Sequence, residues 1–232
     1  QEVPHKKYLN DFLTGQYPGS FGRGELYNSD PTSGDARLCG TTASLCGIEK
    51  ALWDQNEGEL EQAVRFDIML HGYMFVQSGI PVLYSGDEVG QLNDYSYHED
   101  PDKCQDSRYI HRGHFQWDLA KERREKGTMQ NQIFETLSMM EEIRRSHKVF
   151  DTTADVWTLD TWDDAVLGIG RWKDGEKLIA LFNFSGQDRT AWINEDDGEY
   201  TDLLTGAAMK ASGVQIPAYG IWWLYRKEKE NR

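Results

Sequence analysis

The sequence is poor in cysteine and has no long apolar run. Its three cysteines, Cys39, Cys46 and Cys104, are odd in number and lack metal-site spacing, so we expect reduced thiols in the core or on the surface. No apolar stretch reaches the ~18 to 20 residues that span a bilayer, so we expect no membrane segment. The chain starts Gln-Glu-Val-Pro-His, with neither an initiator methionine nor a signal-peptide pattern, and we expect a cytoplasmic protein.

Positive charge is also scarce. Against 39 Asp and Glu the chain has only 25 Lys and Arg, which gives a formal net charge of −14. Such a chain repels phosphate backbones and acidic lipid surfaces, so nucleic-acid and membrane partners are excluded. Hydrophobic residues make up 38% and aromatic residues 12%, which is typical of a globular protein with one or two domains.

Two stretches have helical periodicity. Residues 59–78 repeat apolar side chains at helical spacing, and Gly79 follows as a stop signal. Residues 128–147 do the same, with Thr128 as the N-cap. The glycine-punctuated residues 1–43 predict one short helix and then a long irregular loop.

A short apolar run follows the first long helix. Ile80-Pro81-Val82-Leu83-Tyr84, closed by Ser85-Gly86, predicts a strand that is buried on both faces of a parallel sheet. A helix that leads into such a strand is half of an α/β unit.

From Val149 the pattern changes to short β-type segments separated by turn formers, which predicts an all-β sandwich. The segments are 166–172, 177–184, 189–193, 200–203, 214–216 and 220–225. We place a domain boundary near residue 150, which gives an α/β part over 1–149, a β-sandwich over 150–226 and a charged tail over 227–232.

The α/β part is too small for a complete barrel. One parallel-type strand and two long helices fall far short of eight βα units and about 250 residues. The simplest hypothesis is that the missing strands precede Gln1 and that the chain is an excised or proteolytic piece. The alternative is a small α+β domain that pairs further strands within residues 15–58.

The run from Ser78 to Gly90, SGIPVLYSGDEVG, resembles the eighth barrel strand and following loop of the α-amylase superfamily. Four further stretches resemble amylosucrases in order and spacing: Gly19–Gly24, Asp30–Thr41, Gln91–Asp94 and Asp106–Arg112. The likeness covers nearly the whole chain and is weaker in the sandwich. Gln91 and residues 95–104 depart from the amylosucrase pattern, which bears on acceptor preference.

The resemblance implies a fold of class α/β plus all-β. The chain would be the C-terminal remnant of a (β/α)8 barrel, its last helix-strand-helix with long loops, followed by an antiparallel β-sandwich. It further implies a retaining enzyme that transfers glucose from sucrose or α-glucans, or hydrolyses them. We expect the missing N-terminal half of the barrel as a partner, and self-association of the chain through apolar surface that this half would cover.

The resemblance places the two catalytic carboxylates upstream, together with a His-Asp pair that stabilises the transition state. We therefore assign no catalytic residue to this chain and expect it to be inert alone. Retaining chemistry is complete with two carboxylates about 5 to 5.5 Å apart, so we expect no redox cofactor, no nucleotide and no obligatory metal.

Asp87 and Glu88 are an alternative carboxylate pair. Adjacent residues that continue a strand point to opposite faces, so their side chains would not converge on one sugar ring. We expect Glu88 instead to accept hydrogen bonds beneath the loop at the end of the strand.

Arg37 and Arg108 are the candidate substrate-binding residues. The resemblance places both at the active-site pocket, where a planar guanidinium can hold sugar hydroxyls in a defined direction. The alternative is that each pairs with a neighbouring carboxylate, Asp35 or Asp106, in a surface loop, where such a pair contributes about 0 to 1 kcal/mol.

Two other residue groups have competing interpretations. His111 and His114 could suggest metal binding, but their spacing beside basic residues favours an ordinary loop role. The tryptophans of the sandwich could present stacking platforms for sugars, although aromatic residues in β segments usually form the core. They are Trp157, Trp162, Trp172, Trp192, Trp222 and Trp223.

Two functions compete with the enzyme hypothesis. Residues 150–226 could be a non-catalytic module for carbohydrate binding or domain packing, which glucan affinity of that segment alone would support. A degenerate family member with a structural role would show substituted catalytic carboxylates in the parent protein.

Overall fold

The computed structural model describes residues 5–30, 32–194 and 198–227. The chain forms two compact units: residues 1–67 with 83–134, and residues 68–82 with 135–232. Within the described ranges no helix combines the length and apolar character needed to cross a bilayer. The expected tail over 227–232 lies outside the described residues except for its first residue, and the expected boundary near residue 150 stays a prediction.

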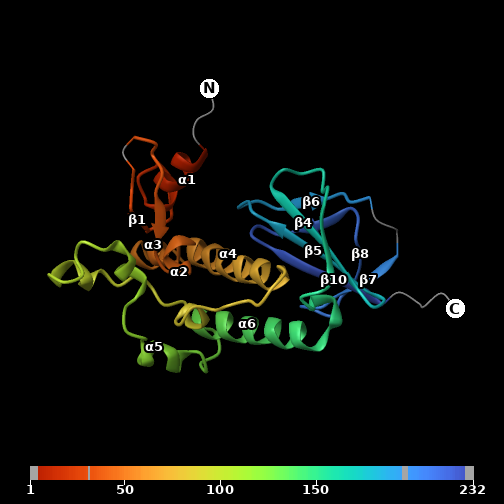
Figure 1. The fold of residues 1–232 in the computed structure, drawn as a ribbon. Helices are drawn as coiled ribbons and strands as arrows, with labels where there is room; N and C mark the ends of the chain where they lie inside the picture. Colours follow the sequence, from red (N-terminus) through yellow and green to blue (C-terminus); the bar gives the residue numbers. More distant parts are fainter. Residues whose placement is uncertain (1–4, 31, 195–197, 228–232) are drawn as a thin grey trace. The chain divides into compact units, whose positions relative to one another are not determined.

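Both long helices predicted from apolar spacing are confirmed (Figure 1). Helix α4 runs over Glu57–Val76 and α6 over Met129–Ser146. The Thr128 hydroxyl accepts a hydrogen bond from the Asn131 backbone N–H at 3.1 Å, so Thr128 caps α6 as predicted.

The predicted strand at residues 80–84 is wrong. These residues belong to no sheet in the described part of the chain, and the Ile80 and Val82 side chains are 85% and 76% exposed. A strand needs neighbours for its backbone N–H and C=O groups. Every strand pairing among the described residues is antiparallel and lies elsewhere. The parallel strand expected within residues 1–149 is therefore absent from the described residues, where the strands of that stretch are the antiparallel pair Glu25–Tyr27 and Arg37–Cys39.

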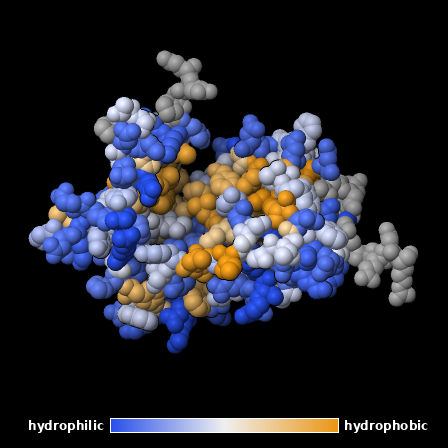
Figure 2. All heavy atoms as spheres, viewed as in Figure 1, coloured by the Kyte–Doolittle hydropathy of each residue, from blue (hydrophilic) through white to orange (hydrophobic). Residues whose placement is uncertain are grey.

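The first unit consists of short elements joined by loops. Strands β1 and β2 pair as an antiparallel hairpin within the stretch predicted to be irregular, and the predicted short helix is α1. Hydrophilic residues dominate the visible surface of the segment that carries η2 and η3 (Figure 2). The elements are α1 (His5–Leu13), β1 (Glu25–Tyr27), β2 (Arg37–Cys39), α2 (Thr42–Leu45), α3 (Ile48–Trp53), η1 (Asp87–Val89), η2 (Tyr95–Glu99), η3 (Ser107–His111) and α5 (Trp117–Glu122).

The second unit is built on antiparallel sheets, as predicted. Six strands pair in the order β3-β4-β5-β10-β7-β8, and β6 pairs with β9 separately. Each predicted β-segment is confirmed as a strand, whereas the sequence pattern does not predict β3, β8 or the short helix η4. The elements are η4 (Lys148–Phe150), β3 (Asp155–Leu159), β4 (Val166–Lys173), β5 (Glu176–Asn183), β6 (Arg189–Ala191), β7 (Glu199–Asp202), β8 (Ala208–Lys210), β9 (Val214–Ile216) and β10 (Ile221–Lys227).

The large sheet is covered on both faces, which explains why β5 is apolar along most of its length. On one face, Ile179 and Leu181 join a core with residues of β6 and β9. On the other face, Phe182 meets Tyr73 of α4 with ring centroids 5.6 Å apart. Each large apolar side chain buried in this way stabilises the fold by about 1.5 to 3 kcal/mol.

Two arginines cap the C-terminal end of α4, whose last turn has no basic residue of its own. Arg171 of β4 is fully buried and donates from Nη1 to the Val76 carbonyl at 2.7 Å. Its Nε and Nη2 atoms donate to the carbonyls of Val149 at 2.7 Å and Asp151 at 2.8 Å. Arg144 of α6 donates from Nη1 to the Phe75 carbonyl and from Nη2 to the Gly79 carbonyl at 2.7 Å. The bonds to Phe75 and Val76 satisfy backbone carbonyls that the helix end leaves without intrahelical partners.

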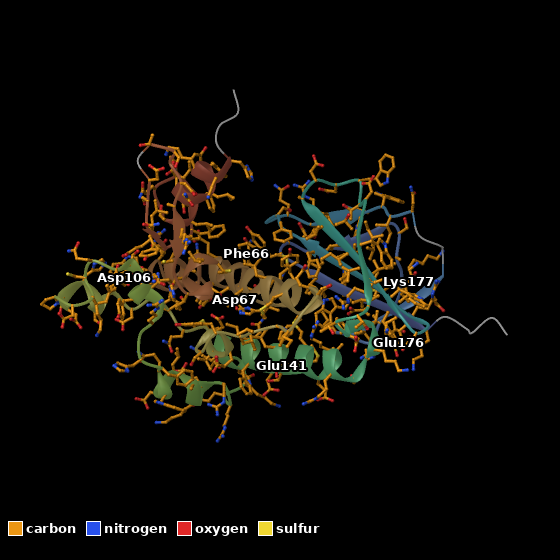
Figure 3. All side chains as sticks on the ribbon, viewed as in Figure 1. Phe66, Asp67, Asp106, Glu141, Glu176 and Lys177 are labelled. Carbon is orange, nitrogen blue, oxygen red and sulfur yellow. The ribbon has the colours of Figure 1, made fainter. Side chains whose placement is uncertain are left out.

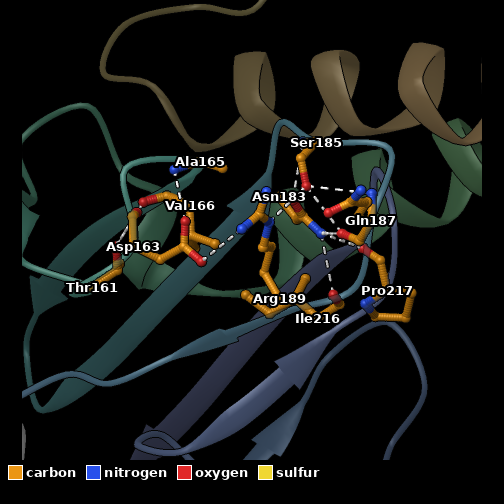
Figure 4. Close-up of polar contacts among 10 residues, drawn as sticks. All are labelled: Thr161, Asp163, Ala165, Val166, Asn183, Ser185, Gln187, Arg189, Ile216 and Pro217. Carbon is orange, nitrogen blue, oxygen red and sulfur yellow. Dashed lines mark hydrogen bonds and ion pairs between the residues drawn. The ribbon is translucent and has the colours of Figure 1, made fainter.

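A buried asparagine at the end of β5 organises the turns around it (Figure 4). The Asn183 side-chain amide nitrogen donates to the carbonyls of Gln187 at 2.7 Å, Pro217 at 2.8 Å and Ile216 at 3.2 Å. Its side-chain oxygen accepts from the Ser185 backbone N–H at 2.9 Å and hydroxyl at 2.8 Å. One side chain thus fixes the β5–β6 turn to the residues that follow β9.

The three cysteines are free thiols, as predicted, and they differ in burial. Cys39 and Cys46 are buried, and burial raises the pKa of both thiols, most strongly that of Cys46. Cys104 is only partly buried.

We expect iodoacetamide at pH 8 to modify Cys104 first, because the thiolate is the reactive form and the other two thiols are shielded and less acidic. Mass spectrometry of tryptic peptides would identify the site. A Cys104→Ser variant should show no fast-reacting thiol until urea unfolds it. Rapid labelling of Cys46 in the folded protein would contradict the structure.

Candidate functional site

The sequence motifs of the first unit meet around Asn93. Its side-chain oxygen accepts from the Thr41 backbone N–H at 2.8 Å, and its side-chain nitrogen donates to the Arg23 carbonyl. Its own backbone N–H donates to the Ser44 hydroxyl at 3.0 Å. The loops carrying Arg23, Thr41 and Asn93 are therefore fixed to one another, although they lie far apart in the sequence.

The DSRYIHR motif forms the short helix η3, with Asp106 as its N-cap. The Asp106 carboxylate accepts from the Arg108 backbone N–H at 3.0 Å. At the other end of η3, His111 accepts at Nδ1 from the Gly40 backbone N–H at 3.3 Å. Burial and Arg112 lower the pKa of His111, so the ring is neutral and serves as an acceptor for the loop.

Arg108 lies between a carboxylate and an aromatic ring. Its Nε donates to Asp106 Oδ1 at 2.8 Å and its Nη2 to Oδ2 at 2.6 Å. Its guanidinium carbon lies 4.5 Å from the centre of the Tyr27 ring. The side chain is 41% exposed, and these bonds use two of its five N–H groups. Figure 3 labels Asp106 on the loop that carries η3.

Arg37 lies in the same neighbourhood. In the β1–β2 hairpin it is directly opposite Tyr27, the residue on which Arg108 stacks. Arg37 is exposed, and Asp35 forms an ion pair with Lys6. Of the two sequence-predicted arginines, Arg108 stacks on Tyr27, and Arg37 is the backbone partner of that tyrosine. For Arg108 the pairing with Asp106, expected as an alternative, is present.

The Arg108 guanidinium lowers the pKa of Asp106 to about 2. A carboxylate with a depressed pKa stabilises the folded state above its ordinary pKa, and this contribution is lost as the pH falls through about 2.

We expect Asp106 to titrate near pH 2 when its carboxyl carbon is followed by NMR. Arg108→Met should raise the midpoint toward the ordinary value of 3.8, because the hydrogen bonds to the carboxylate are lost. Arg112→Met is the matched control and should move the midpoint much less. A midpoint near 3.8 in the unsubstituted protein would show that the pair does not persist in solution.

A second polar group beside the hairpin has no counterpart in the sequence prediction. Glu25 accepts from the hydroxyl of buried Tyr97 and lies 2.9 Å from His98 Nε2. Burial, followed by Glu25, raises the pKa of Tyr97 above its ordinary range. Tyr97 and His98 fall in the segment 95–104, whose lack of periodicity gave no signal for their contact with Glu25.

Asp87 and Glu88 were expected to continue a strand, and that placement is wrong. Both lie in η1, and Glu88 accepts from the Gly86 backbone N–H at 2.8 Å, which confirms the role predicted for it. Glu88 also lines a pocket of about 350 Å³ together with Phe115, Trp117 and Phe134.

Gln91, a departure from the amylosucrase pattern, is buried. Its side chain donates to the His114 carbonyl at 3.2 Å and accepts from the Gln116 backbone N–H at 3.0 Å. It therefore holds the loop that follows η3. Within the described ranges no three His, Cys, Asp or Glu side chains gather as metal ligands.

No protein-family model matches the chain. Among curated proteins it is similar to the glucosylglycerate phosphorylase of Escherichia coli (strain K12), with 26% identity over 176 residues, or 75% of this chain. That match covers only 30% of the relative's length.

Solved structures share the fold. AmyP in complex with maltose has a TM-score of 0.57 at 16% identity, over 73% of this chain and 36% of that one. The trehalulose synthase MutB from Pseudomonas mesoacidophila MX-45 has a TM-score of 0.51 at 17% identity, over 69% of this chain and 38% of that one. Together with the curated relative, these likenesses make the chain similar to enzymes of the α-amylase superfamily over part of the length of each protein.

Proposed function

We propose that the chain is the C-terminal portion of a retaining enzyme that transfers glucosyl groups from sucrose or α-glucans, or hydrolyses them. Its catalytic carboxylates would come from sequence outside these 232 residues, and the chain alone would be inert. The match to only 30% of the curated relative supports this division. The hydrogen bond from the Gly86 backbone N–H to the Glu88 carboxylate also supports the proposal. It engages one of the two alternative carboxylates, Asp87 and Glu88, in a bond to the loop.

The observation that carries the proposal is the stacking of Arg108 on Tyr27, whose backbone partner across the hairpin is Arg37. The aromatic ring supports one guanidinium through a cation–π contact, while the bidentate bond to Asp106 fixes its plane. The remaining N–H groups of Arg108 can donate to sugar hydroxyls in a fixed direction. In this role Arg108 and Arg37 position the substrate and do not take part in bond breaking.

A second candidate is phosphorolysis of a glucoside with an acidic aglycone. The curated relative is a glucosylglycerate phosphorylase, and guanidinium groups bind carboxylate and phosphate in bidentate geometry. Arg37 is exposed and is the backbone partner of Tyr27, on which Arg108 stacks, so this surface presents guanidinium groups. A neutral sugar acceptor needs them less than an anion does.

The test is an assay of the protein encoded by the full open reading frame, beside this chain alone. Substrates are sucrose, maltotriose and glucosylglycerate, each with and without inorganic phosphate, and the products followed are glucose, fructose, glucan and glucose 1-phosphate. Turnover of sucrose or maltotriose by the long form only supports the proposal. Phosphate-dependent turnover of glucosylglycerate alone would establish the second candidate instead.

Variants of the long form test the arginines. Arg108→Gln should raise KM by about tenfold or more with a smaller change in kcat, because a charge-assisted hydrogen bond to substrate is lost. Arg65→Gln, on the exposed face of α4, is the matched control and should change neither constant. Unchanged KM in both Arg108→Gln and Arg37→Gln would exclude the proposed roles.

A further inference from the structure

We propose that Trp162 and Trp192 form an α-glucan-binding surface on the second unit, remote in sequence from the arginines of the candidate site. The choice of α-glucan as ligand rests on the proposed function. The two side chains are 70% and 58% exposed. By contrast, Trp223 in the same unit is fully buried. Because these two indoles are exposed, packing in the hydrophobic core does not explain their presence, and a binding role does.

The two tryptophans lie on adjoining backbone segments. The Trp192 backbone N–H donates to the Thr161 carbonyl at 2.9 Å. Thr161 is 4% exposed, and its hydroxyl lies 2.7 Å from the Val166 carbonyl. The residue that precedes Trp162 is therefore fixed both to β4 and to the segment that follows β6, so the two indoles start from neighbouring points.

Trp162 is held in a conformation that side chains of its size rarely adopt. Its φ of 57° lies in the left-handed region. Asp160 accepts from the Trp162 backbone N–H at 3.0 Å, and Asp163 accepts from the Ala165 backbone N–H at 2.9 Å. Asp163 also lies 3.8 Å from Arg189, which donates to Ser185 of the Asn183 turn (Figure 4). The surrounding bonds thus maintain a torsion that points to function.

Trp192 lies over a glycine. A Cβ atom on Gly213 would come within 3.1 Å of the Trp192 Cζ3 atom and 3.3 Å of Cη2. The Gly213 backbone N–H in turn donates to the Ala191 carbonyl at 2.9 Å. The indole therefore packs close to the Gly213 backbone, while more than half of Trp192 stays exposed.

Exposed polar residues flank both tryptophans in the sequence. Asp160, Asp164 and Asn194 are all exposed next to them in the sequence, and they can accept hydrogen bonds from hydroxyl groups. The apolar face of a pyranose stacks on an indole, and its hydroxyl edge then meets such groups. Nucleic-acid bases also stack on aromatic side chains, but carboxylates and a net charge of −14 repel their phosphates. Two indoles suit an oligosaccharide better than a single sugar.

The experiment is a calorimetric titration of the chain with maltoheptaose. We expect binding that weakens about tenfold or more in Trp192→Ala and in Trp162→Ala, because each removes one stacking face. Trp162→Phe keeps an aromatic face and should bind within about threefold of the original. Trp172→Ala is the matched control, since Trp172 is 38% exposed on β4 away from this turn, and it should bind like the original. Circular dichroism confirms that each variant is folded.

Each outcome decides a different point. Unchanged affinity in folded Trp162→Ala and Trp192→Ala, or no binding at millimolar maltoheptaose, overturns the surface even if the long form acts on α-glucans. Equal affinity for cellohexaose overturns the assignment to α-glucans. Tryptophan-dependent binding by a chain whose long form turns over no α-glucoside upholds the surface and refutes the proposed function.

Discussion

Arg171→Met is expected to lower the free energy of unfolding by about 3 to 5 kcal/mol. The arginine is fully buried and is bonded to the carbonyls of Val76, Val149 and Asp151. Methionine fills similar space but donates no hydrogen bond, so the buried carbonyls of Val76 and Val149 and the part-buried one of Asp151 lose their partner. Burial, and then Arg144, already lowers the Arg171 pKa to about 10, so the charge is costly and is retained for these bonds.

Urea unfolding followed by tryptophan fluorescence would measure this loss. Arg145→Met, on the exposed side of α6, is the matched control and should cost less than about 1 kcal/mol, because an exposed ion pair contributes little. Arg171→Lys should recover only part of the stability, since one ammonium group cannot reproduce the planar fork. A loss below about 1 kcal/mol for Arg171→Met would show that water or a rearranged backbone replaces these bonds.

Asn183→Asp is expected to destabilise the chain by about 3 to 5 kcal/mol at pH 7 although the side chains have the same shape. The amide nitrogen faces three carbonyl oxygens, those of Gln187, Ile216 and Pro217. A carboxylate oxygen in its place would repel all three. The pKa of the new carboxyl should rise in the folded state, because only the protonated form can donate to a carbonyl.

The sign of the pH effect follows from that raised pKa. A group with a raised folded pKa favours folding at low pH and loses this contribution as the pH rises through the folded value. The deficit of Asn183→Asp should therefore be smaller at pH 4 than at pH 7, as measured by urea unfolding at both. Asn194→Asp, at an exposed position, is the control and should change stability little at either pH. An equal loss of stability at pH 4 and pH 7 would show that altered packing, and not the charge of the new carboxylate, destabilises the variant.

Regular, repeated patterns were readable from the sequence. Helices α4 and α6 have enough turns for their apolar spacing to register, and β4, β5 and β10 are bounded by turn formers. Strands β1 and β2 have three residues each, too few to show a period of two. Residues 80–84 have the composition of a buried strand, but burial depends on neighbours that composition does not reveal.

The candidate site was predictable only through motif resemblance. Arg108 and Arg37 were identified by the runs that contain them, but the pairing of Arg37 with Tyr27 depends on a hairpin that the pattern does not predict. Glu25 and Tyr97 are 72 residues apart, and no local signal links them. Arg171 and Asn183 resemble ordinary polar residues of half-exposed strands. Their importance comes from carbonyls of distant segments, which only the folded chain brings to them.

The left-handed backbone torsion of Trp162 lowers the stability of the fold, whereas the indole at this position serves the proposed glucan binding. A bulky side chain in this region costs about 1 to 2 kcal/mol, which glycine would recover. A library of variants selected only for survival at high temperature should therefore replace Trp162 early, because nothing in that selection rewards the indole. Populations selected on glucan should keep it. The frequency of tryptophan at position 162 in each selected population would then show whether stability or glucan binding had been selected.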